Sequence, residues 1–116
     1  MAVSVDQVRE VALGLPRAYE ALVRGRVKFR VGSIVFVAFS ADEALMGFGF
    51  PREERQALVD SEPDKFQLPG QGDMRYQWVV ARMDALDEDE MRELVTDAWR
   101  MCVPKKVAAE HLGDDA

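Results

Sequence analysis

The chain has 116 residues, of which 48% are hydrophobic and 31% charged, and its formal net charge is −6. This length suits a single domain, 1–116, whose core needs no disulfide or metal to fold, and the composition is not that of a disordered chain. The negative charge argues against a protein whose main task is to coat nucleic acid, because such binding depends on neutralising phosphates with Lys and Arg.

Residues for metal or covalent chemistry are scarce. Cys102 is the only cysteine and His111 the only histidine, which excludes an internal disulfide and disfavours zinc sites and Ser-His-Asp arrangements. We interpret Cys102 as a small core residue. We expect no cofactor, no metal site, no catalytic residues and no enzyme, although two carboxylates brought together by the fold are a route to catalysis that spacing leaves open.

No segment predicts export or membrane insertion. The N-terminus lacks a basic stretch followed by a long apolar run. The longest mostly apolar stretch, 31–39, is far shorter than the roughly 20 residues that cross a bilayer. We therefore expect a cytoplasmic protein without membrane contact.

The chain begins with a predicted helix. Ser4 and Gln7 have the spacing of a capping box, and apolar residues at helical intervals predict a helix over 5–13. Gly14 and Pro16 should end it, because Gly tolerates the left-handed conformation that follows many helices and Pro disfavours helix at the residue before it.

A β-hairpin with an unusual charge pattern follows. The segment 19–22 is a link or a short first strand, and Gly32-Ser33 predicts a type II′ turn between strands 24–31 and 34–39. In that register Phe29 lies opposite Phe36, Val27 opposite Ala38, Lys28 opposite Val37 and Arg26 opposite Phe39.

Four cations stand at every second position of the first hairpin strand, so all should point to one face: Arg24, Arg26, Lys28 and Arg30. The stems of Arg26, Lys28 and Arg30 should lie across Val35, Val37 and Phe39. Two interpretations stay open: a solvated or edge-protecting face, and a surface that binds an anionic ligand or partner.

The middle of the chain predicts more sheet. Gly47 and Gly49 should mark a bulge or a close backbone approach in a third strand, 44–50, and they lack the context of a phosphate loop. Pro51 suits the first turn of a helix. The further expected elements are a helix over 51–59, a short edge strand at 65–68, a loop at 69–73 and a strand over 75–83.

Tyr76 and Trp78 should share one face of that last strand. Sheet aromatics near cations can stack on nucleic-acid bases. Aromatic residues on strands more often pack in a core, and we favour core packing here.

The C-terminal part predicts helices. In the acidic run 87–90, Asp87 should cap a helix and Glu90 complete a capping box, a structural role that we favour over a catalytic one. That long helix should continue through Cys102 until Pro104 interrupts it. A terminal helical segment over 105–111 and a frayed tail, 112–116, should follow.

The chain resembles the MmcQ/YjbR family of small bacterial proteins. The resemblance rests on these segments: 15–16 (Leu-Pro), 29–32 (Phe-Arg-Val-Gly), 36–38 (Phe-Val-Ala), 78–80 (Trp-Val-Val) and 98–107 (Ala-Trp-Arg-Met-Cys-Val-Pro-Lys-Lys-Val). The family pattern favours Gly-Lys and Ser-Tyr where this chain has Gly32-Ser33 and Ala98-Trp99. The first departure removes a turn lysine that could contact phosphate.

This resemblance implies an α+β domain in which an N-terminal helix, a short middle helix and a long C-terminal helix pack on an antiparallel sheet, similar to the double-wing domain of a phage transcription factor. It implies DNA as the partner and no defined catalytic residues. The expected contact residues are Arg24, Arg26, Lys28 and Arg30, followed by Arg75, Lys105 and Lys106.

Two alternatives to DNA binding stay open. The first is a protein-interaction module, such as a homodimer in which the basic strand meets the acidic segment 84–90. The second is a small-ligand or enzymatic pocket near Gly47, Gly49, Tyr76 and Trp78, which would need a concave site with converging polar groups.

Overall fold

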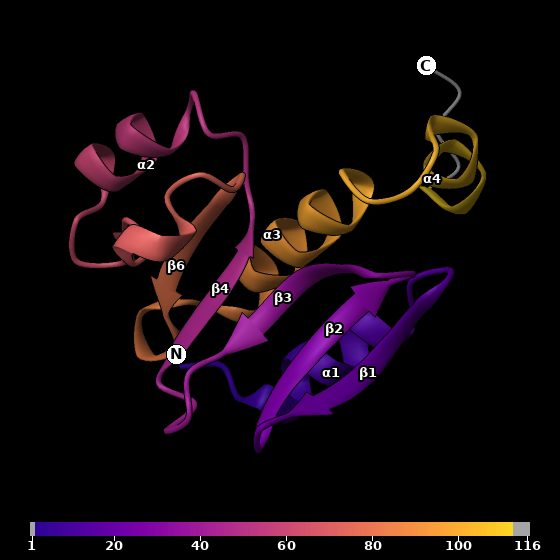
Figure 1. Cartoon of the computed structure of the whole chain (residues 1–116), viewed down its shortest axis with the longest axis horizontal. Coiled ribbons are helices and arrows are strands. Elements are labelled where there is room, and N and C mark those ends of the chain that lie inside the picture. Colours follow the sequence, from indigo (N-terminus) through magenta and orange to yellow (C-terminus); the bar gives the residue numbers. More distant parts are fainter. Residues whose placement is uncertain (1, 113–116) are drawn as a thin grey trace.

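The computed structural model describes residues 2–112 and shows a six-stranded antiparallel sheet packed by helices (Figure 1). The expected α+β architecture is confirmed. The helices are α1 (Val5–Leu13), α2 (Arg55–Ser61), α3 (Glu88–Arg100) and α4 (Lys105–Leu112), with short 3-10 turns η1 (Gln71–Asp73) and η2 (Met83–Ala85). The strands are β1 (Ala18–Val23), β2 (Arg26–Val31), β3 (Ile34–Phe39), β4 (Leu45–Gly49), β5 (Phe66–Gln67) and β6 (Trp78–Arg82), in the spatial order β1-β2-β3-β4-β6-β5.

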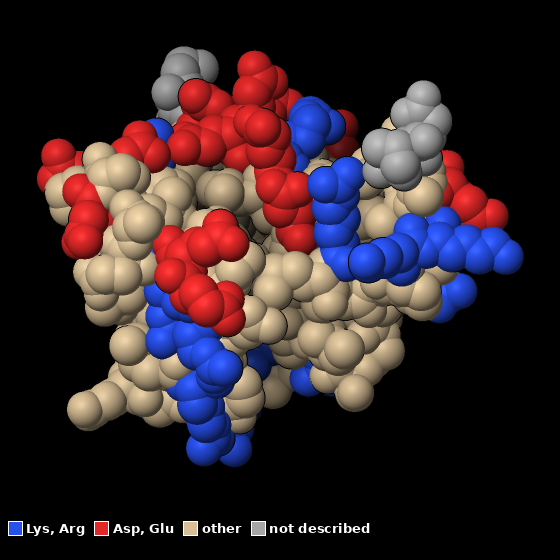
Figure 2. All heavy atoms as spheres, turned by 90° about the horizontal axis from the view of Figure 1, so that it is seen from above, with Lys and Arg blue, Asp and Glu red and all other residues tan. Residues whose placement is uncertain are grey.

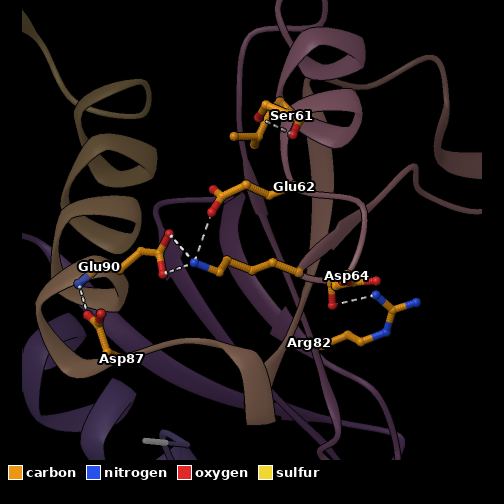
Figure 3. Close-up of polar contacts among 8 residues, drawn as sticks. Ser61, Glu62, Asp64, Arg82, Asp87 and Glu90 are labelled. Atoms are coloured by element: carbon orange, nitrogen blue, oxygen red, sulfur yellow. Dashed lines mark hydrogen bonds and ion pairs between the residues drawn. The ribbon is translucent and has the colours of Figure 1, made fainter.

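A side-chain cap stands at the start of each of the two helices that pack on the sheet, α1 and α3. The Ser4 hydroxyl accepts a hydrogen bond from the Gln7 backbone N–H, and the Gln7 side chain accepts one from the Ser4 N–H, which confirms the predicted capping box of α1. Asp87 caps α3 as predicted, by accepting from the Glu90 N–H at 2.7 Å. Glu90 does not complete a second capping box, because its carboxylate instead binds Lys65 (Figure 3).

The segment 19–22, expected to be a link or a short strand, lies within strand β1. A tight turn that was not predicted joins β1 to β2. Arg24 and Gly25 take φ values of 54° and 77°, as in the type I′ turn that matches the twist of a hairpin. The prediction of a strand from residue 24 was therefore wrong at its start. Arg24 lies in the turn and does not alternate with the three cations of β2.

A bulge shifts the β2–β3 register. Gly32 alone of the two turn residues takes a positive φ, 61°, as expected for type II′. Val31 faces Ile34 and Arg30 faces Val35, but Phe29 then faces Val37 and not Phe36, because Phe36 is an extra residue in β3. The predicted pairs beyond Arg30 were therefore wrong by one residue, and the cation stems do not cross Val37.

The bulge determines which β3 side chains enter the core. Phe36 and Val37, although consecutive, are both fully buried, and Phe39 is buried against Phe29 in an edge-to-face contact. A local bend of this kind is what an inserted residue produces in a strand. On the face that carries the cations, Val35 lies opposite Arg30 and Ala38 opposite Lys28.

Several predicted boundaries move. Helix α2 begins at Arg55 and not at Pro51, and β6 begins at Trp78 and not at Arg75. The bounds of α1 are as predicted, but Gly14 caps it with a right-handed φ of −80° and not in the left-handed conformation. Helix α3 ends before Cys102. Of the tail expected to fray, Leu112 belongs to α4, and 113–116 lie outside the described residues.

Helices α1 and α3 cover one face of the sheet. Figure 1 shows both behind the strands, and their apolar residues form one buried cluster with those of alternate strand positions. Trp99 of α3 is fully buried, and its indole N–H donates to the Pro16 carbonyl at 2.8 Å. Within residues 2–112, no helix is long and apolar enough to span a bilayer. The opposite face of the sheet carries no covering helix in the view of Figure 1.

Candidate functional site

The uncovered sheet face forms a broad open groove of about 790 Å³. Its lining residues come from β2, β3, β4 and β6, from the segment 73–77, and from Met101 and Cys102 at the end of α3. The groove therefore joins the basic strand to the aromatic segment around Trp78, two features that the sequence analysis treated separately.

Strand β2 presents its cations to this face. Arg26, Lys28 and Arg30 alternate with the more buried Val27 and Phe29. Arg26 and Lys28 line the groove. Among the ion pairs of residues 2–112, none involves these three cations or Arg24.

Arg30 occupies a special place among them. It is half-buried on β2 opposite Tyr19 of β1, and its Nε atom is buried without a hydrogen-bond partner. A buried donor without a partner carries a desolvation cost. Arg30 does not line the groove itself, so it contributes charge from beside the groove.

Some cations outside β2 are held by partners within the structure. Lys65 Nζ lies 2.9 Å from Glu90 Oε1 and 3.2 Å from Glu62 Oε1, and these carboxylates raise the pKa of the lysine, the Glu90 hydrogen bond most of all (Figure 3). Arg82 donates to the backbone carbonyls of Pro63 and Asp64. Strand β2 thus carries three cations on one face without an ion pair in residues 2–112, whereas the cation of β6, Arg82, is held by backbone carbonyls.

The charge distribution is segregated. Seen from above, Asp and Glu side chains gather over the upper part of the molecule, whereas Lys and Arg form separate clusters at the lower left and the right (Figure 2). A local positive surface can thus exist on a chain whose net charge is −6. Asp73 is the one carboxylate among the groove residues.

Trp78 lies on the groove side of the sheet and not in the core. Its neighbours Val79 and Ala81 are fully buried, whereas Trp78 is half-buried and lines the groove. A Cβ placed on Gly47 would lie 2.5 Å from the indole Nε1 and 2.7 Å from Cζ2. The indole therefore lies across Gly47, which is the close approach expected at one of the two glycines. No register shift occurs in β4, so the alternative of a bulge was wrong.

Tyr76 also opens onto the groove. Its side chain is 51% exposed, so the core packing that we favoured for it was wrong. The Arg75 guanidinium lies 4.9 Å from the centre of the Tyr76 ring and donates to its hydroxyl at 2.9 Å. Arg75 thereby adds a positive charge at the aromatic side of the groove.

A buried arginine holds the aromatic segment in place. Arg55 at the start of α2 is 6% exposed, and its guanidinium donates to the carbonyls of Met74, Tyr76 and Trp78 at 2.6, 2.9 and 3.1 Å. One planar fork thus ties three points of the segment 74–78 to α2. No sequence motif marks Arg55, because its partners are backbone atoms about twenty residues away.

The other residues considered from the sequence are the lysines of α4, which lie outside the groove, and Cys102, whose thiol is not activated as a nucleophile. Lys105 and Lys106 are exposed at the start of α4 and are not among the groove residues. Burial raises the pKa of the Cys102 thiol, which favours the unreactive protonated form. Within residues 2–112, no three His, Cys, Asp or Glu side chains come together as a metal site would require.

The comparisons with known proteins agree with the fold. The model of the YjbR family matches residues 13–101. The chain belongs to the YjbR family. The crystal structure of Deinococcus radiodurans protein DR2400, whose family-model domain is DUF419, is similar with a TM-score of 0.76, over 97% of this chain and 91% of that chain, at 19% identity. At that identity the likeness concerns the fold alone. No curated protein matches the chain. The YjbR assignment confirms the family resemblance noted from the sequence.

Proposed function

We propose that this YjbR chain is a non-enzymatic binding module whose open sheet face binds DNA through its phosphates. The observation that supports the proposal is the set of β2 cations, which face a groove and have no carboxylate partner within the described residues. In the proposal Arg26 and Lys28 contact phosphates directly, and Arg30 adds positive charge from beside the groove.

Other cations take secondary roles in this proposal. Arg24 extends the positive surface to the tip of the β1–β2 hairpin, and Arg75 extends it to the far side of the groove. Lys105 and Lys106 add attraction from outside the groove. The acidic remainder of the chain repels a long polyanion, so we expect weak binding that depends strongly on salt.

Fluorescence anisotropy of labelled DNA tests the proposal. The double variant Arg26→Gln/Lys28→Gln removes two groove cations, and Arg92→Gln/Arg100→Gln removes two charges from α3, where both arginines pair with carboxylates of their own helix. Because net charge changes equally, only the position of the lost charge differs. We expect the β2 variant to bind more weakly and to reduce the slope of log K against log salt by about two, since each phosphate contact contributes roughly 0.9. Equal effects of the two variants would contradict the proposal.

The groove also favours a second candidate, a small anionic ligand. Its volume of about 790 Å³ lies in the range of small-molecule sites, and it combines apolar walls with a few cations. Calorimetric titration with a nucleoside monophosphate separates this candidate from DNA binding. A ligand that fills the groove should bind as tightly alone as within a longer strand.

The protein-interaction alternative remains a proposal of lower rank. The acidic residues Asp84, Asp87, Glu88 and Asp89 are exposed and lie in the segment expected to meet the basic strand of another copy. Sedimentation at several protein concentrations tests it. A species that stays monomeric would remove the homodimer.

A further inference from the structure

We infer that the DNA bound by the open sheet face is single-stranded, with bases stacked on Trp78 and Tyr76 while the β2 cations hold the phosphates. The inference rests on the proposed function and specifies the form of its ligand. Four observations carry it: the distance between cations and aromatics across the sheet, the packing of the Trp78 indole against Gly47 at the groove, the fixation of the aromatic segment by Arg55, and the position of Arg75.

The groove places its cations and its aromatics apart. Strands β3 and β4 lie between β2 and β6, so at about 4.8 Å per strand the two sets are roughly 14 Å apart. Arg26 and Lys28 line one side of the groove, and Tyr76 and Trp78 the other. A flexible strand of a few nucleotides can cross such a distance with phosphates on one side and unstacked bases on the other. A positively charged track beside aromatic side chains is the general arrangement of single-strand binding surfaces.

Trp78 is packed closely against β4. The Nε1 and Cζ2 edge of its indole lies over Gly47, where a Cβ would approach the ring to 2.5 Å. The side chain also lines the groove, so it is within reach of a ligand bound there. Every base has a π-face that can stack there without sequence preference.

The aromatic segment is fixed before any ligand arrives. The three hydrogen bonds from Arg55 hold the carbonyls of Met74, Tyr76 and Trp78. Rigid aromatic side chains lose little conformational entropy on binding. Arg75 covers the Tyr76 ring at 4.9 Å and can contact the phosphate next to a base stacked nearby.

Duplex DNA fits this surface less well. In a duplex the bases are paired and stacked, so they are not free to stack on Trp78 or Tyr76. The major groove, about 12 Å wide, admits a helix or a two-stranded ribbon, whereas the candidate surface spans four strands of a sheet. Duplex binding would use the cations alone.

The test compares three labelled probes on the unchanged protein by anisotropy at low salt: a mixed-sequence strand of about 15 nucleotides, the duplex of the same length, and a strand in which most bases are replaced by abasic sites. The abasic strand keeps the phosphates and removes the stacking partners. We expect it to bind roughly 5- to 150-fold more weakly than the intact strand, the range that stacking of one base corresponds to. The duplex should also bind more weakly than the intact strand.

Variants of the protein test the same inference by removing or displacing the aromatic side chains. Tyr76→Ala removes an exposed ring, and Gly47→Ala displaces the Trp78 indole while leaving every cation in place. Both should reduce the preference for the intact strand over the abasic strand at least severalfold. Tyr19→Ala is the control for loss of an exposed tyrosine that is not among the groove residues, since Tyr19 is 43% exposed on β1 and lies opposite Arg30, beside the cations and away from Trp78. This control should keep the preference.

The outcomes separate the inference from the proposed function. Equal binding of the intact strand, the abasic strand and the duplex would leave phosphate binding standing and overturn the single-strand inference. A deoxynucleoside monophosphate that binds as tightly as the strand would overturn it in favour of the small-ligand candidate. If no probe binds even at low salt, the proposed function fails and the inference fails with it.

Discussion

The two faces of the sheet use the same strands for opposite purposes. On the helix side, alternate residues such as Phe29, Phe48 and Val79 are fully buried and uncharged. On the open side, the residues between them include cations, glycines and the half-buried Trp78 beside apolar residues such as Val35 and Val80. The two tryptophans illustrate the difference, since Trp99 is fully buried whereas Trp78 lines the groove. Stability should therefore depend mainly on the first face and ligand binding on the second.

The largest expected effect compares the two tryptophans. Trp99→Ala removes the largest core side chain and leaves the Pro16 carbonyl without its donor, so we expect a loss of about 3–5 kcal/mol in the free energy of unfolding. Trp78→Ala should cost at most about 2 kcal/mol, because the side chain is only half-buried. Urea denaturation of both variants measures the difference. Equal losses would mean that the open face is part of the core.

The next largest effect on stability should come from Arg55, which holds the segment 74–78 at the edge of the open face. Arg55→Met leaves three carbonyls of the segment 74–78 without their donor, so we expect a loss of about 2–4 kcal/mol and faster hydrogen exchange in that segment. Arg55→Lys should recover little of this, because an ammonium lacks the planar fork that reaches all three carbonyls. A lysine variant as stable as the unchanged protein would show that charge alone suffices.

Two glycines in β4 give a matched pair. Gly47→Ala forces the indole of Trp78 to move, and we expect a cost of about 1–3 kcal/mol with a change in tryptophan fluorescence. At Gly49 a Cβ would meet Ala98 Cβ at 3.6 Å, an ordinary contact, so Gly49→Ala should cost less than about 1 kcal/mol. Denaturant unfolding followed by fluorescence measures both. The reverse order would contradict the position of Trp78 over Gly47.

The smallest effect lies on the helix side and depends on pH. Arg9 of α1 holds both carboxylate oxygens of Glu20 in β1 at 2.8 and 3.0 Å, and this hydrogen bonding lowers the pKa of Glu20. Because the pKa of Glu20 is lower in the folded protein than the ordinary value near 4.3, the interaction stabilises the fold at pH values above about 4.3. This contribution is lost as the pH falls through the folded pKa.

Arg9→Gln should therefore cost about 0–1 kcal/mol at neutral pH, because the pair is partly exposed, and progressively less as the pH falls through the folded pKa of Glu20. Unfolding of both proteins in urea across that pH range measures the difference. A difference that grows toward low pH would contradict the assignment.

Features that depend on neighbouring residues could be predicted from the sequence. The Ser4 capping box, the Gly32 turn, the Asp87 cap and the alternation of cations along β2 all follow from local spacing. The family resemblance added the architecture. These signals were enough to identify the basic strand before its surroundings were known.

Features that depend on distant packing could not be predicted. The bulge at Phe36 follows from how β3 fits against both β2 and the core, and it overrides the simple hairpin register. Arg55 acts on backbone carbonyls, which the sequence does not identify as partners. Trp78 has the alternation of a core residue, and only the uncovered state of its face gives it another role.

The most direct test of the account uses the two indole N–H signals in a ¹H–¹⁵N NMR spectrum during titration with a single-stranded DNA oligonucleotide. If the open face binds DNA, the Trp78 indole signal and the β2 amides should shift with increasing DNA while the Trp99 indole signal stays in place. Shifts confined to α4 or to the helix face, with Trp78 unchanged, would contradict the account.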